Sequence, residues 1–198
     1  MSIREWMSTL KDDPSPEKES MNQVAMATAI GLVAGLAINA LIVVSRDLMT
    51  VGQLLFPRVL FGSAVAALLA TTAFGRGKTH FAKKALYDFP LLALDIVMIM
   101  AAAALVGLIN RDSFAFDSWA WGWLAVILAC QLVRNLWLGS KKVTGLRLGI
   151  LCLILGLTAN IAILLFAPAD DRVAAVASIA ALILITVQFW REVITPFR

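Results

Sequence analysis

Two ionisable residues stand inside long apolar runs of this sequence. Asp95 lies in YDFPLLALDIVMIMAAAALVG, and Arg134 lies in CQLVRNLWLG. If these runs cross a bilayer, each charge is costly there, so it either pairs with an opposite charge or serves an ion or proton route. Counted from a predicted helix start at Leu86, Asp95 is about 13 Å deep, close to the bilayer midplane. We expect Arg134 to meet Asp95 or, nearer the membrane surface, Asp88.

Polar residues continue along the predicted helix that carries Arg134. Gln131, Arg134 and Asn135 are spaced i, i+3 and i+4, which places them on one helical face. Three interpretations of this polar interior stay open. Asp95 and Arg134 form a structural ion pair, or they line a hydrated cavity or an ion or proton route, or Asp95 stays protonated and bonds a backbone carbonyl.

The residue types for most catalytic and cofactor chemistry are missing from these runs. The single histidine, His80, falls in a predicted loop, and Cys130 and Cys152 lie too far apart in sequence for a Cys-x-x-Cys unit. There is no Gly-x-Ser-x-Gly element and no phosphate-binding Gly-rich loop. We therefore expect no enzymatic activity of its own, no cofactor and no metal site.

Two predicted helices each carry a face of small residues that ends in an asparagine. Small residues let helices approach closely, and an asparagine can hydrogen-bond across the contact. We expect these faces to pack helices together within the chain or against other membrane subunits. The faces are Ala27, Gly31, Gly35 and Asn39, and Gly149, Cys152, Gly156 and Asn160.

The elements that must position these residues follow from composition. The 198 residues are 61% hydrophobic and 15% charged, with a mean hydropathy of +0.86, against about 45–50% apolar residues in soluble domains. Runs of about 20 apolar residues cross a bilayer as helices, because lipid leaves backbone groups no other partner. The sequence predicts an all-α bundle of six transmembrane helices, at 22–44, 54–75, 86–109, 119–138, 146–167 and 173–193.

Outside these spans, residues 1–21 are predicted to form a cytoplasmic segment. Its first part can be a short amphipathic helix or a frayed terminus, and DPSPEKES is predicted to be a polar linker because its prolines discourage a helix. Residues 22–198 then form one transmembrane domain.

Orientation follows from the basic residues. Twelve lysines and arginines fall on one side of the predicted bundle, and three or four fall on the other. The positive-inside rule then places both termini in the cytoplasm, as in a multi-pass protein of a bacterial inner membrane. Trp119, Trp121 and Trp123 are expected to mark the outer interface.

Arg58 falls near that outer interface. Its long side chain could reach the headgroups, with Asp47, Asp112 and Asp117 on the same side. We expect a membrane-edge anchor, for which lysine would serve equally, with a role in an outer vestibule as the alternative.

These observations favour a small channel- or transporter-type bundle with a polar interior around Asp95 and Arg134. The alternative is a non-catalytic accessory or scaffold subunit of a larger membrane complex. Expected partners are the lipid bilayer and either further copies of the chain or other membrane subunits. The net charge of +4 does not indicate nucleic acid, because the basic residues cluster beside apolar runs.

Overall fold

The computed structural model describes residues 16–52, 56–82, 89–140 and 146–194. The described residues form α-helices and short connections without a β-strand. Six helices are long and apolar enough to cross a membrane. They are α2 (Pro16–Val51), α3 (Pro57–Ala82), α4 (Phe89–Ile109), α5 (Ser118–Ser140), α6 (Leu146–Phe166) and α7 (Asp171–Ile194).

The helix ends follow local capping rules. Gly52 adopts φ 67° and its N–H donates to the Leu48 carbonyl at 2.8 Å, which ends α2 with a left-handed glycine cap. Asp117 Oδ1 accepts from the Ala120 N–H at 3.0 Å, and Asp170 Oδ1 accepts from the Arg172 N–H at 2.8 Å. These carboxylates satisfy free amides in the first turns of α5 and α7.

The first helix starts earlier than its apolar run. α2 begins at Pro16, where proline is tolerated because a first-turn N–H needs no partner within the helix. Residues 16–21, predicted as part of a linker, are therefore helical. The predicted amphipathic helix before them lies outside the described residues.

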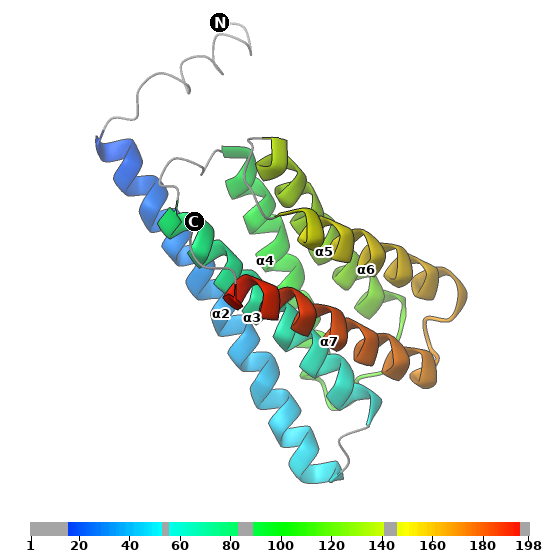
Figure 1. Cartoon of the computed structure of the whole chain (residues 1–198). Helices are drawn as coiled ribbons and strands as arrows, with labels where there is room; N and C mark the ends of the chain where they lie inside the picture. The colour runs from blue at the N-terminus through cyan, green and yellow to red at the C-terminus, as the bar shows by residue number, and fades with distance from the viewer. Residues whose placement is uncertain (1–15, 53–55, 83–88, 141–145, 195–198) are drawn as a thin grey trace, which may run out of the picture.

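The six helices form a closed ring in the order α2, α3, α7, α6, α5, α4, with α4 packing back against α2. α2 begins and α7 ends at one end of the bundle, at the upper left of Figure 1. We call this the proximal end. The opposite, distal end carries the connections around Gly52, at 110–117 and at 167–170.

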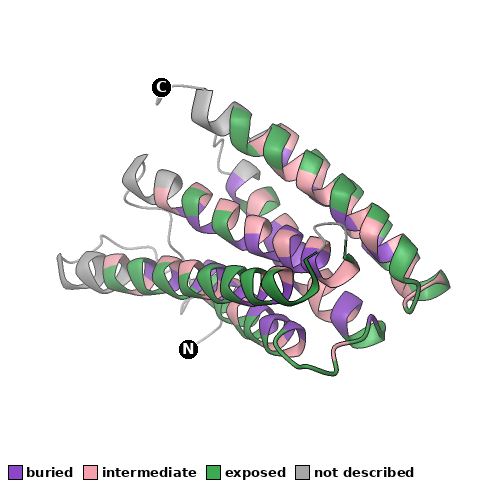
Figure 2. Ribbon diagram, turned by 90° about the horizontal axis from the view of Figure 1, so that it is seen from below, coloured by how far each residue is buried: buried purple, intermediate pink, exposed green. Residues whose placement is uncertain are grey.

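The packed core lies mainly among α2, α3, α4 and α5. It includes Leu69 and Leu105, both at 0% exposure, whereas Ala174 is the one α7 residue in the main buried cluster. Figure 2 shows α7 largely exposed or half-buried along its length. Large apolar side chains such as Leu165 and Val176 are exposed on the outside of α6 and α7, as expected for a surface that meets lipid.

Close approach of α2 and α3 depends on Gly62. A Cβ atom there would lie 2.7 Å from Cγ2 of Val44, so only glycine fits this contact without a shift. The small-residue face predicted on α2 lies elsewhere. Ala27, Gly31, Gly35 and Asn39 are all exposed on the outer side of α2, so this face packs against no other described helix.

Candidate functional site

The most buried acid among the described residues is Asp95, at 1% exposure on α4. It follows the start of α4 at Phe89 by six residues, or about 9 Å along the axis. It remains inside the ring, away from the lipid-facing surface.

Asp95 lies between two arginines from opposite sides of the ring. Its Oδ1 is 2.7 Å from Nη2 of Arg76 on α3 and 3.8 Å from Nε of Arg134 on α5. Both arginines are buried, Arg76 at 2% and Arg134 at 7% exposure. Arg76 Nη2 also donates to Sδ of Met98 at 3.0 Å. We call Arg76, Asp95 and Arg134 the charged centre.

A neutral hydrogen bond flanks the charged centre. Gln131 Nε2 donates to Thr72 Oγ1 at 2.8 Å, and Thr72 Oγ1 donates to the Leu68 carbonyl at 2.7 Å. Thr72 precedes Arg76 by one helical turn, and Gln131 precedes Arg134 by three residues. The hydrogen bond between Gln131 and Thr72 and the charged centre therefore lie one above the other along the same faces of α3 and α5.

Asn135, the other predicted polar residue of α5, lies apart from this centre. Asn135 is half-buried. It lies near α6, because a Cβ atom added at Gly149 would be 3.7 Å from its Nδ2. Asp88 lies outside the residues whose side chains the structure describes.

Arg76 is the functional candidate that sequence reasoning missed. It follows the predicted end of its span at Gly75 and is one of the twelve basic residues predicted to lie on the cytoplasmic side. A signal was present, because Thr72 and Arg76 are spaced i, i+4 and so share a polar face directed toward α5.

At the distal end, Arg58 makes several specific contacts. Its Nε lies 2.9 Å from Oδ2 of Asp47, and its Nη2 donates to the carbonyls of Ile109 at 2.6 Å and Arg111 at 2.8 Å. The guanidinium also lies 5.7 Å from the ring centre of Phe114. Arg58 therefore ties α2, α3 and the 110–117 connection together, while its roles as a membrane-edge anchor or in an outer vestibule stay predictions.

Four aromatic rings fill the space behind Arg58. Phe61 stands 5.2 Å from Trp121 and 5.3 Å from Phe116, ring centre to ring centre, and Phe114 and Phe116 are 5.1 Å apart. Trp121 is 2% exposed and its Nε1 donates to the Pro168 carbonyl at 2.9 Å. Trp121 was predicted to lie at the lipid interface, but it is buried inside the bundle.

This distal aromatic cluster is separated from the charged centre by apolar packing. Leu69, Leu105 and Ile127, each at 0% exposure, belong to the core between the two. The distal end of the ring is therefore closed in this conformation.

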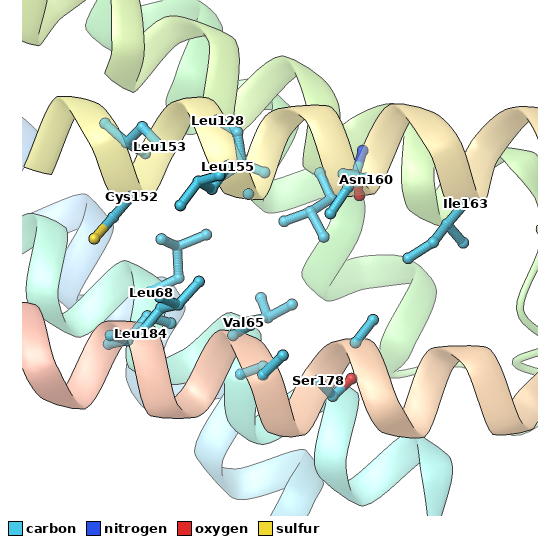
Figure 3. Close-up of a pocket in the computed structure, with 18 of the residues that line it drawn as sticks. Val65, Leu68, Leu128, Cys152, Leu153, Leu155, Asn160, Ile163, Ser178 and Leu184 are labelled. Atoms are coloured by element: carbon cyan, nitrogen blue, oxygen red, sulfur yellow. The ribbon is translucent and has the colours of Figure 1, made fainter.

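A second feature is a cavity of about 170 Å³ between α6 and α7, with α3 and α5 at its back. The small-residue face of α6 points here. Gly156 and Asn160 line the cavity (Figure 3), whereas Gly149 is covered by Gln188, whose Nε2 would lie 3.2 Å from an added Cβ. Asn160 Nδ2 donates to the Trp121 carbonyl at 2.9 Å.

Among the described residues, no group of three or more His, Cys, Asp or Glu side chains could hold a metal ion. Comparisons of the chain with protein-family models, with curated proteins and with solved structures find no match.

Proposed function

We propose that the protein is a small, non-catalytic membrane transport protein in which the charged centre binds the transported species. The observation that carries the proposal is the burial of Asp95 at 1% exposure between Arg76 and Arg134. Taking three ionised groups out of water costs several kcal/mol per ion, and apolar replacements of such groups are often as stable. A charged centre retained inside a membrane bundle is therefore better explained by use than by stability.

The arrangement favours a carrier over an open channel. The charged centre lies toward the proximal end, while the distal end is closed by Arg58 and the aromatic rings around Phe61. A transported species would reach Asp95 from the proximal side, and release on the other side requires a second arrangement of the distal end. We propose that the proximal end faces the cytoplasm and that the membrane is a bacterial inner membrane; the excess of basic residues at this end supports the orientation.

Flux measurements in liposomes test this proposal. The purified protein should dissipate an imposed gradient of protons, alkali cations or halide ions. Asp95→Asn should abolish that flux, while Asp112→Asn, which changes a fully exposed side chain, should leave it unchanged. Because Asp95→Asn breaks the buried ion pair with Arg76 and can fail to fold, the charge-balanced double variant Arg76→Gln/Asp95→Asn is measured beside it. Flux that survives in a folded double variant would refute the assignment.

An accessory-subunit function is the second candidate, and the outer face of α2 favours it. Ala27, Gly31, Gly35 and Asn39 are exposed together, and added Cβ atoms on the two glycines would meet nothing within 4 Å. Such a face suits close packing with a helix from another chain. Gly35→Leu should then release a copurifying subunit in mild detergent, whereas Gly107→Leu on α4 should retain it.

A further inference from the structure

We propose that the cavity between α6 and α7 is a binding site for one aliphatic chain of a membrane lipid that carries a hydroxyl or amide donor. The site is separate from the charged centre and does not depend on the transport proposal. Three observations support it: the position of the cavity opening, the side chains that line the cavity, and the unmade hydrogen bond of Asn160 Oδ1.

The cavity opens sideways, between two helices on the outside of the ring. Leu155 and Ala159 of α6 and Ala180 of α7 line it and are themselves exposed. α7 buries little of its length, with Ala174 and Ser178 as its buried described residues. Because this surface lies within the candidate membrane spans, its opening faces the region that lipid chains occupy.

The lining suits a hydrocarbon chain. Leu68, Leu128, Leu153, Ile163 and Leu184 surround the space (Figure 3). A cavity of about 150 Å³ lined by such side chains stays free of water and accepts an apolar guest the size of benzene. The volume of about 170 Å³ therefore admits a segment of aliphatic chain of similar volume. The bound chain would make van der Waals contacts with lining side chains that have no partner atoms while the cavity is empty.

Asn160 adds a polar requirement at the cavity wall. The residue is 3% exposed, and its Oδ1 is buried without a hydrogen-bond partner among the described residues. Its Nδ2 is already engaged with the Trp121 carbonyl, which fixes the amide and leaves the oxygen as an acceptor. An unmade buried hydrogen bond is costly. A ligand donor, from a hydroxyl or an amide, would satisfy this oxygen.

Trp121 provides a direct readout because it lines the cavity and is 2% exposed. In a variant with Trp6, Trp119, Trp123, Trp137 and Trp190 replaced by Phe, the remaining fluorescence reports on Trp121 alone. The protein is reconstituted in phosphatidylcholine vesicles and titrated with a terminally brominated dodecanol, which quenches tryptophan on contact. Nonbrominated dodecanol is the reference for each variant.

Gly156→Leu is the decisive change. A Cβ atom added at Gly156 meets nothing within 4 Å and Gly156 lines the cavity, so we expect leucine at this position to occupy the cavity. Gly107→Leu is the matched control, because Gly107 is equally open and lies on the exposed side of α4. We expect saturable quenching in the parent and in Gly107→Leu, and loss of most of it in Gly156→Leu. Equal quenching in both variants, or none in the parent, would overturn the proposal.

The hydrogen-bond requirement is tested separately with Asn160→Leu. In the parent, bromododecanol should bind roughly fivefold more tightly than bromododecane, the gain expected from one hydrogen bond. Asn160→Leu should remove that preference while the alkane still quenches. If Asn160→Leu still bound bromododecanol more tightly than bromododecane by the same factor, the hydroxyl would not hydrogen-bond to Asn160.

Discussion

Nη2 of Arg76 lies 2.7 Å from Oδ1 of Asp95, across the interior of the ring from α3 to α4. These helices make little direct backbone contact, because α2 packs between them. The ion pair therefore holds together two elements that backbone packing alone does not join. Arg134 approaches the same oxygen from α5 at 3.8 Å, so Asp95 is the acceptor on which three helices converge.

This geometry predicts strong coupling between Arg76 and Asp95. Arg76→Gln and Asp95→Asn should each lower the free energy of unfolding by about 3–5 kcal/mol, because each breaks the buried ion pair of 2.7 Å. The double variant should recover much of that loss. Arg134→Gln should cost less, since its contact is longer. Unfolding of the parent, Arg76→Gln, Asp95→Asn and their double variant in one detergent measures the cycle, and strictly additive losses would contradict the pairing.

Arg58 should not tolerate lysine. An ammonium can keep the ion pair with Asp47, but it cannot also serve the carbonyls of Ile109 and Arg111 with the same fork of donors. We expect Arg58→Lys to lower the free energy of unfolding by about 2 kcal/mol. Arg46→Lys is the control, because Arg46 is half-exposed with ion-pair distances of 3.7 and 3.8 Å. Equal melting temperatures for the two variants would favour the edge-anchor interpretation.

The contact at Gly62 predicts a size limit between α2 and α3. Gly62→Ala should lower the free energy of unfolding by about 1–3 kcal/mol through overpacking against Val44. Adding Val44→Ala should return part of the loss, because it removes the clashing methyl groups. Gly107→Ala, where an added Cβ meets nothing within 4 Å, should be nearly neutral. A neutral Gly62→Ala would mean that the two helices separate readily.

The orientation is tested at Ser113, an exposed residue of the distal connection. In a background with Cys130→Ala and Cys152→Ala, a cysteine at Ser113 should react with a membrane-impermeant thiol reagent added to intact cells. Reaction only after the cells are opened would place the distal end in the cytoplasm and reverse the proposed topology.

The sequence by itself determined the number and approximate limits of the six described helices that are long and apolar enough to cross a membrane. Long apolar runs are readable because a bilayer has a fixed thickness and every backbone group must bond within its own helix. The same reasoning identified Asp95 as buried and Arg134 as one neighbour. The prediction of a linker at residues 16–21 was wrong because proline was taken only as a residue that discourages a helix. Proline also suits the first turn of a helix, where its missing N–H needs no partner.

Tertiary structure alone decided how each helix is rotated about its axis. Lipid is as apolar as a protein core, so the pattern of apolar residues does not separate an inward face from an outward one. The two small-residue faces illustrate this: Gly31 and Gly35 face outward from α2, whereas Gly149 and Gly156 face other helices or the cavity. The pairing of Arg76 with Asp95 has the same origin, because depth follows from counting residues, but the direction of a side chain follows from which helices pack together.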